Sequence, residues 1–478
     1  MLSPHSDTYY CYESNKRKGL GWLVCFESKN QKQRNGSLVQ KLSDACSSSP
    51  PAPLELGQLP IMSGLQVLIS GASVAGPALA FFLARAGAKV TIVEQAPSLR
   101  TGGQNVDIRG VGLKVVRRMG LEAAVLNRAT QEEGVAFVDA SNRRRAEFPV
   151  DPTGQNLSMT AEIEIMRGDL ARIFYDATCD DVKYVFGNSI ESMVEKDEKV
   201  NVLFKHGLKQ QFDLVFAADG LGSPTRALIF GHDKQKSLIK SLGQYVAWFT
   251  IPRQGSDGSW ARWYNAPGRR LILLRPDTKA EASQQISRAS LWICSDSARM
   301  QGYSKLTIAE QKAMMHDLFV DAGWEASRVL AGMDSADDFY MQEVAQVKID
   351  ECWSRGRMVV LGDAAYCPSP ISGMGTTVAM VGAYLLAGEV ARSPNDPLAA
   401  FASYERLMRP FVTKAQKLIP GSPQLANPET AWGIWVLYSI LNMVSWTTRL
   451  QAFLGRFIGP PVDAIVLPDY EAKFSGNR

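Results

Sequence analysis

The sequence predicts an α/β fold that opens on a parallel sheet, continues into a β-rich region and ends in helices. The first observation is a βαβ pattern between residues 65 and 94. The second is a group of short strand-like segments, broken by Gly and Pro, between about 240 and 295. The third is a strongly apolar and aromatic stretch, Trp432–Trp446. We therefore expect two regions that share a large buried core, followed by a helical C-terminal segment.

Composition excludes several classes of protein. The 478 residues carry 52 basic and 48 acidic side chains, and the net charge of +4 gives no electrostatic reason to expect a nucleic-acid partner. The seven cysteines contain no C-x-x-C pair, and the four histidines show no spacing typical of metal ligands. The sequence therefore predicts neither a disulfide framework nor a metal site, and it favours a reducing, cytoplasmic compartment.

Residues 1–60 are polar and irregular, with a basic cluster at Lys16–Lys18 and a Ser/Pro-rich stretch around residues 47–51. The apolar run Leu20–Phe26 is too short and too interrupted for the core of a signal peptide. We interpret this region as disordered or as an extension of the gene model. The folded part of the chain is expected to begin near residue 64.

The βαβ pattern begins with a buried strand at Leu65–Ile69. An apolar helix is expected over Ala75–Ala86, closed by Gly87, and a second strand over Lys89–Glu94. Because a helix joins the two strands, they are expected to lie parallel in one sheet.

The turn between the first strand and the helix reads GASVAG, with Gly71 and Gly76 at its ends. In this position, backbone N–H groups and the positive end of the helix face a pyrophosphate. Ser73 replaces the usual middle glycine and adds a side chain where the backbone should approach phosphate. Glu94 follows roughly 20 residues later, where its carboxylate can accept from both ribose hydroxyls of an adenosine. A glycine-rich turn without a nucleotide is the alternative for this segment alone.

Two further segments carry an acid and glycines at fixed spacing. The first, LVFAADGLGSPTR over Leu214–Arg226, is a strand that runs into a turn containing Asp219 and Gly220. The second, GRMVVLGDAA over Gly356–Ala365, contains Gly362 and Asp363. It is followed by Gly373 and Gly375 ahead of an apolar helix.

The glycine-rich turn, Met166–Leu170, Leu214–Arg226 and Gly356–Ala365 follow one another in this order. Together they resemble the class A FAD-dependent aromatic monooxygenases, which have a p-hydroxybenzoate hydroxylase-like fold. The resemblance covers roughly residues 64–420. Gly102–Asp107 followed by Glu162–Arg167 is most similar to the tetracycline-inactivating branch of that family.

The resemblance implies an FAD-binding, Rossmann-like domain of the glutathione-reductase type with an inserted β-rich substrate domain. The FAD-binding domain would be discontinuous over residues 64–235 and 340–420. The substrate domain would span 240–339, and C-terminal helices would occupy 421–478.

The function implied is that of a monooxygenase that uses NAD(P)H and O₂ to hydroxylate an aromatic or enolic small molecule, of the polyketide-type secondary metabolites, through a flavin C4a-hydroperoxide. The cofactor carries that chemistry. The residues expected to contact FAD are Gly71, Ser73, Gly76, Glu94, Arg167, Asp219, Gly220, Gly362, Asp363, Gly373 and Gly375.

Residue chemistry fits these assignments. Asp363 can accept from a ribityl hydroxyl, and the helix that begins near Gly375 can stabilise the anionic reduced flavin through its positive end. Arg167 offers a fork of donors. By resemblance, Asp219 also affects the use of NADPH.

Four residues are expected at the substrate, namely Asn105, Asp107, Trp248 and Arg270. Asn105 and Asp107 would pass near the isoalloxazine ring, whereas Trp248 and Arg270 would face the substrate cavity. An ordinary role for the aromatic residues in the core or on a sheet face is the alternative.

The sequence departs from the family pattern at several positions. Tyr366 stands in place of a common His, Met374 replaces a polar residue, and Gly382 replaces an acid of the following helix. No catalytic acid or base is therefore carried over.

Other functions remain open on the sequence. An epoxidase or a Baeyer–Villiger oxygenase needs only a different substrate, and an NAD-dependent dehydrogenase would use the first glycine-rich motif alone. A flavin-binding protein without oxygenase turnover, membrane-associated through residues 432–446, is a further alternative. This stretch reaches only about 22 Å as a helix, short of the roughly 30 Å of a bilayer core, so a helix packed on the protein is expected.

Overall fold

The computed structural model describes residues 62–100, 102–150, 161, 163–277, 286–446 and 465–474. They belong to one compact unit, Pro60–Arg478. The expectations for residues 1–60 and the motif residue Glu162 lie outside the described residues.

A six-stranded sheet carries the glycine-rich turn, with the order β17-β18-β11-β1-β2-β7. Its neighbours run parallel except for β17, which is antiparallel to β18. The strands are β1 (Gln66–Ser70), β2 (Lys89–Glu94), β7 (Lys183–Phe186), β11 (Leu214–Ala217), β17 (Ser354–Arg355) and β18 (Met358–Val360). With α2 (Ala75–Arg85) between β1 and β2, the predicted parallel βαβ opening is confirmed to within one residue.

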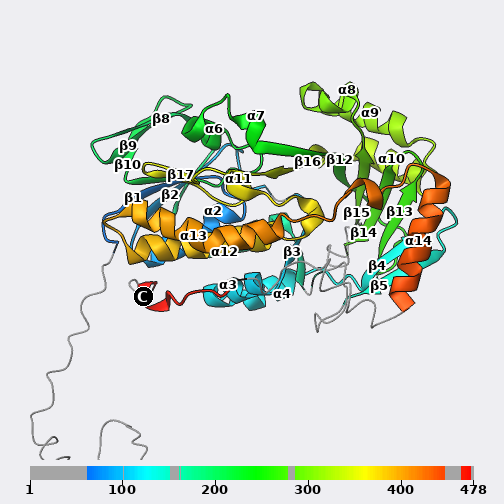
Figure 1. Ribbon diagram of the computed structural model, residues 1–478, viewed down its shortest axis with the longest axis horizontal. Coiled ribbons are helices and arrows are strands. Elements are labelled where there is room, and N and C mark those ends of the chain that lie inside the picture. Colours follow the sequence, from blue (N-terminus) through cyan, green and yellow to red (C-terminus); the bar gives the residue numbers. More distant parts are fainter. Residues whose placement is uncertain are drawn as a thin grey trace, which may run out of the picture. The chain divides into compact units, whose positions relative to one another are not determined.

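Helices and a small sheet bury the six-stranded sheet. α2, α12 (Gly375–Arg392) and α13 (Pro397–Ala415) lie beside one another against it (Figure 1). α12 is apolar nearly all round, as a helix buried on all sides must be, and most of its residues are buried. The three-stranded sheet β8 (Ile190–Lys196), β9 (Lys199–Phe204) and β10 (Lys209–Phe212) adds Val200, Val202 and Phe212 to the same core.

A second, seven-stranded sheet has the order β16-β12-β15-β14-β13-β4-β5. All neighbours are antiparallel except β13 and β4. The strands are β4 (Gly134–Val138), β5 (Arg144–Pro149), β12 (Ile239–Pro252), β13 (Ala261–Ala266), β14 (Arg270–Pro276), β15 (Ile286–Cys294) and β16 (Tyr340–Val347). The predicted β-rich region is present, and its sheet also takes β4, β5 and β16 from outside residues 240–339.

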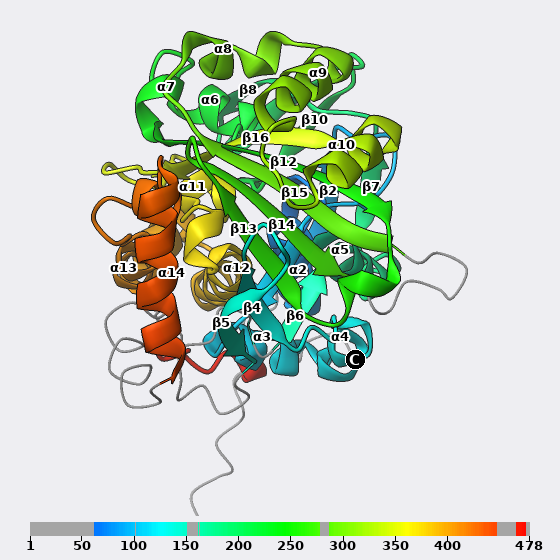
Figure 2. The same ribbon diagram turned by 90° about the vertical axis from the view of Figure 1, so that its right-hand side faces the viewer.

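Helices cover one face of the seven-stranded sheet, as Figure 2 shows. α9 (Ile308–Phe319) and α10 (Ala326–Ser335) contribute Met315, Phe319 and Leu330 to a core shared with β12, β14 and β15. The remaining helices are α3 (Val111–Met119), α4 (Glu122–Arg128), α5 (Arg167–Asp176), α6 (Pro224–Phe230), α7 (Gln235–Leu238), α8 (Ala298–Gln301) and α11 (Asp363–Tyr366). Short 3₁₀ turns occur at Gly255–Asp257, Tyr303–Lys305, Pro370–Ser372, Gln424–Ala426 and Glu471–Lys473.

The apolar C-terminal stretch forms α14 (Ala431–Trp446). One side of it packs on the sheet through Tyr438 and Val444, as expected for a helix docked on the protein. In the part of the chain that the structure describes, no helix is long and apolar enough to cross a membrane.

The departure from the family pattern at Gly382 is explained by packing. A Cβ atom at Gly382 would lie 2.0 Å from the Tyr366 hydroxyl oxygen, which is itself 2.9 Å from the hydroxyl of Tyr404. The tyrosine therefore fills the space that a side chain at position 382 would need. Both replacements belong to one buried arrangement.

We expect Gly382→Ala to lower the free energy of unfolding by about 1–3 kcal/mol through overpacking. Tyr366→Phe removes the clashing atom, so the double variant should lose less stability than the sum of the two single variants. Chemical denaturation of the four proteins measures this coupling. Additive losses would show that the two sites do not share this space.

Candidate functional site

One cavity of about 1370 Å³ joins the two sheets. At one end, its lining includes Gly71, Glu94 and Asp219 from the edge of the six-stranded sheet. At the other, it includes Trp248 and Trp292 from the seven-stranded sheet. The predicted motifs and the predicted substrate region therefore open into a single space.

The glycine-rich turn allows a close approach of backbone segments. A Cβ atom at Gly71, where φ is +109°, would lie 2.4 Å from the carbonyl oxygen of Ala218, and one at Gly76 would lie 2.0 Å from the carbonyl oxygen of Gly71. No described side chain caps the start of α2, and its first turn carries no acid. Ser73 also lines the cavity. The turn and the helix end thus present free N–H groups of the kind that bind phosphate.

Glu94 ends β2 at the cavity wall. Its two carboxylate oxygens accept from the backbone N–H groups of Ala72, at 3.0 Å, and Ala96, at 2.9 Å. Each oxygen keeps a second lone pair for a ligand. The carboxylate is thereby held next to the glycine-rich turn.

Asp219 is fixed by the turn that follows β11. It accepts from the Ser223 hydroxyl and, at 3.0 Å, from the backbone N–H of Thr225. Burial raises the pKa of the Asp219 carboxyl above its ordinary value, while the hydrogen bonds from Ser223 and Thr225 act in the opposite direction.

We predict that this pKa shift contributes to stability in flavin-free protein. A folded-state pKa above 3.8 means that the folded chain holds a proton that the unfolded chain has released, so this contribution falls as pH rises from about 4 through the raised pKa. Asp219→Asn removes it. The unfolding free energy of the wild type should therefore fall relative to that of Asp219→Asn as pH rises above 3.8.

The exposed Asp197 provides the matched control for that measurement, because its side chain is 86% exposed. Asp197→Asn should give the same pH profile as the wild type. A wild-type profile parallel to that of Asp219→Asn would contradict the raised pKa.

Arg226 connects two of the motifs. Its buried guanidinium donates to the carbonyl oxygens of Leu221, at 2.7 Å, and Ala364, at 2.9 Å. The turn after β11 and the turn after β18 are therefore locked together. The sequence showed the spacing of Arg226 within its motif, but it did not show that Arg226 joins the two turns.

Asp363 begins α11 and faces the open cavity. The protein that surrounds the Asp363 carboxyl raises its pKa by desolvation, whereas Arg167 lowers it. Gly362 and Gly373 both have positive φ, at 63° and 60°, which suits glycine in these tight turns.

The N-terminus of α12 lies on the same cavity wall. The helix begins at Gly375 with no described side-chain cap and no acid in its first turn, and Gly375 and Thr376 line the cavity. The positive end of this 18-residue helix is therefore free to act on a ligand.

Arg167 begins α5 and also lines the cavity. Within the described ranges, no carboxylate forms an ion pair with its guanidinium. Gly103 makes room for it, because a Cβ atom there would lie 3.1 Å from Arg167 Nε. The cavity therefore contains a cation whose hydrogen-bond donors are available to a ligand.

The segment β3 (Asn105–Ile108) passes along the cavity and pairs with β6 (Ile163–Met166). Asn105 and Asp107 both line the cavity. Asp107 forms an ion pair of 2.7 Å with Arg109, which sequence reasoning did not anticipate.

An aromatic wall closes the substrate half of the cavity. The Trp248 ring stacks on Tyr340 with 4.9 Å between ring centroids, and it meets Trp292 edge to face at 5.7 Å. The Tyr340 hydroxyl donates to Gln104 Oε1 at 2.5 Å. Tyr340 and Gln104 were missed because they are brought together by strands that are far apart in sequence.

The expectation that Arg270 faces the cavity is wrong. Arg270 donates to the carbonyl oxygens of Pro267 and Leu318 and pairs with Asp321 at 2.5 Å, on the side of β14 that α9 covers. Arg275 of the same strand lines the cavity instead. It forms an ion pair with the buried Glu164.

The described residues contain no group of His, Cys, Asp and Glu that could hold a metal ion. Tyr366 and Gly382 do not line the cavity, whereas Thr376 does.

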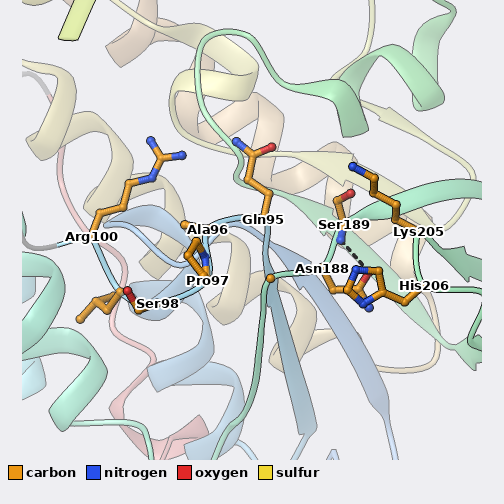
Figure 3. Close-up of a pocket in the computed structure, with 11 residues that line it drawn as sticks. Gln95, Ala96, Pro97, Ser98, Arg100, Asn188, Ser189, Lys205 and His206 are labelled. Carbon is orange, nitrogen blue, oxygen red and sulfur yellow. Dashed lines mark hydrogen bonds between the residues drawn. The ribbon is translucent and has the colours of Figure 1, made fainter. Parts of the chain in front are cut away.

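A second pocket of about 670 Å³ adjoins the Glu94 end of the cavity. The two share the lining residues Gln95, Arg100, Asn188 and Ser189. Figure 3 shows Arg100 on one side of this pocket and Lys205 and His206 on the other. Its lining is therefore polar and basic.

A parallel sheet with a glycine-rich turn, a carboxylate at the end of the next strand and a cavity that continues to a second sheet is an arrangement typical of a nucleotide-dependent enzyme. The family described as FAD binding domain matches residues 64–417. The chain belongs to this family, the class A aromatic-hydroxylase-like flavin monooxygenases, and is an FAD-dependent monooxygenase.

The chain matches its relatives over nearly their full length. The FAD-dependent monooxygenase asL6 of Sarocladium schorii is 35% identical, over 85% of this chain and 98% of its own. The flavin-dependent monooxygenase eupH of a Phoma species is 37% identical, over 86% and 98%.

Among solved structures, the tetracycline destructase Tet(51) matches with a TM-score of 0.67 and 31% identity, over 85% of this chain and 99% of its own. Klebsiella pneumoniae HpxO complexed with FAD and uric acid shares the fold, with a TM-score of 0.65 and 18% identity, over 85% of this chain and 100% of its own.

Proposed function

We propose that this monooxygenase uses NAD(P)H and O₂ to hydroxylate an aromatic or enolic small molecule of the polyketide type. The observation that carries the proposal is the single cavity, which joins the nucleotide-binding turn to an aromatic wall on a separate sheet. Two relatives are named as fungal monooxygenases, and two solved neighbours at 31% and 32% identity are named as tetracycline destructases. A polycyclic aromatic or enolic substrate is consistent with the cavity and with the names of these proteins.

FAD would lie in the cavity along the predicted residues. Gly71, Ser73 and Gly76 would hold the pyrophosphate on the N-terminus of α2, and Glu94 would accept from the adenosine ribose. The adenosine would then lie toward the pocket of Figure 3. When bound, the cofactor supplies the hydride-accepting and oxygen-activating chemistry.

The other motifs would hold the flavin half. Asp363 would accept from the ribityl chain, and Gly373 and Gly375 would let the backbone lie close to it. The positive end of α12 would stabilise negative charge on the reduced ring. Asp219 and Gly220 line the same cavity, and Arg167 would donate to the cofactor.

The protein would act on the substrate by positioning and by excluding water. Trp248, Tyr340 and Trp292 offer flat apolar faces for an aromatic ring, and Asn105 and Asp107 offer polar groups near the flavin half. NADH or NADPH would be consumed with each turnover. The dehydrogenase alternative is disfavoured because it gives no role to the two later motifs, which line the same cavity.

We expect Trp248→Leu to raise the KM for a productive substrate by about 2- to 12-fold, since an aromatic contact contributes about 0.5–1.5 kcal/mol. Trp324→Leu is the control, because the Trp324 ring packs on Tyr264 on the opposite side of the sheet. Steady-state oxidation of NADPH gives the two values. An unchanged KM in Trp248→Leu would show that the aromatic wall does not contact the substrate.

The function itself is tested with a panel of polyhydroxylated aromatic compounds, NADPH and isotopically labelled O₂. A product that contains one labelled oxygen atom supports the proposal. Oxidation of NADPH that yields only hydrogen peroxide with every panel member would contradict it for this substrate class.

A further inference from the structure

The inner side of α14 explains how this helix is held. Tyr438 is buried, and its hydroxyl accepts from the backbone N–H of Asn265 at 3.0 Å and lies 3.2 Å from the carbonyl oxygen of Val138, to which it donates. Val444 is buried in the same cluster. The helix is therefore fixed to the seven-stranded sheet in one rotational setting.

The outer side of α14 is apolar as well. The exposed side chains are Trp432 (72%), Trp435 (65%), Ile440 (50%), Met443 (59%) and Trp446 (84%). A helix docked on a protein normally turns charged and polar residues outward. Residues 431–446 contain no charged side chain, and Figure 2 shows α14 along the flank of the sheet.

The charged residues in the sequence around α14 indicate what its outer face contacts. From Thr430 to Val462 the sequence contains no acid, but it contains Arg449 and Arg456. Exposed indole rings fit the headgroup region of a bilayer, and basic residues that follow them in the sequence favour anionic lipids.

We propose that the outer face of α14, formed by Trp432, Trp435, Ile440, Met443 and Trp446, docks on the surface of an anionic phospholipid membrane. The helix lies in the headgroup region and does not cross the bilayer. Its 16 residues reach only about 24 Å.

The location of α14 gives this contact a use that rests on the proposed function. Trp263 packs against the cluster that holds α14 and also lines the cavity. Ala426 and Asn427, shortly before α14, line the cavity too. The inner side of α14 thus adjoins the substrate half of the cavity, and docking of its outer face would bring that end of the cavity near an apolar substrate held in the membrane.

The test is co-sedimentation of the full chain with vesicles of phosphatidylcholine alone or with one quarter phosphatidylserine. We expect binding to the anionic vesicles that weakens as salt is added. A variant with Trp432→Gln, Trp435→Gln and Trp446→Gln should bind about tenfold less or weaker still. Flavin content and thermal unfolding show that this variant is folded.

A matched control carries Leu208→Gln and Ile308→Gln, two side chains 58% and 59% exposed elsewhere on the protein. It should bind vesicles as the wild type does. An absence of wild-type binding to anionic vesicles would overturn the proposal. So would a dimer in the absence of lipid that the tryptophan variant converts to monomer, because the face would then belong to a second copy. Because docking is measured without turnover, its failure is independent of the monooxygenase activity.

Discussion

Gly71→Ala is expected to yield protein that retains little or no FAD. The added Cβ would lie 2.4 Å from the carbonyl oxygen of Ala218, and φ at this position is +109°. Backbone strain and overpacking together lower the free energy of unfolding by about 2–5 kcal/mol. Any shift of the turn also moves the N–H groups that would bind the pyrophosphate. The ratio of flavin to protein absorbance and the thermal unfolding temperature measure both effects.

Gly222→Ala provides the matched control in another turn of the same site. A Cβ atom there would meet nothing within 4 Å, and Gly222 lines the same cavity. This variant should keep its flavin and its stability. Full flavin content in Gly71→Ala would show that the turn does not carry the pyrophosphate.

Arg167→Met should raise the Kd for FAD by about 10- to 150-fold. The estimate follows from the loss of charge-assisted hydrogen bonds that contribute about 1.5–3 kcal/mol. Because the guanidinium lines the cavity and pairs with none of the described carboxylates, its removal should leave the fold intact. Arg167→Lys keeps the charge but loses the planar set of hydrogen-bond donors. Its Kd for FAD should lie between those of the wild type and Arg167→Met. Titration of flavin-free protein with FAD gives the Kd values.

Arg172 lies on the same helix and pairs with Asp176 at 2.9 Å on the surface. Arg172→Met should therefore leave the Kd for FAD unchanged. An equal loss in both variants would assign the effect to helix α5 as a whole. An unchanged Kd in Arg167→Met would show that Arg167 does not contact FAD.

The local sequence pattern was sufficient to predict the part of the fold that carries the glycine-rich turn. The run of apolar residues before Gly71, the glycine-rich turn and Glu94 are close in sequence, and each follows from strand, turn and helix chemistry. The later motifs also fall where expected, because the carboxyl ends of parallel strands meet at one edge of a sheet.

The substrate half could not be predicted to the same depth. β14 is apolar on both faces, with Ile272 buried under the helices and Leu273 at the cavity, so no alternation showed which way Arg270 points. The contact of Trp248 with Tyr340 depends on the register between β12 and β16, which are far apart in the chain.

Compensating changes were also hidden from the sequence. The replacements at Tyr366 and Gly382 were each visible as departures, but only the packed structure shows that one side chain occupies the space of the other.

The most direct test of the FAD-dependent activity is the visible absorption spectrum of the purified chain during anaerobic addition of NADPH, with and without polyhydroxylated aromatic compounds. Flavin bands should bleach, and they should bleach faster with a compound that fits the aromatic wall. A protein that stays colourless and cannot be reconstituted with FAD would contradict this activity.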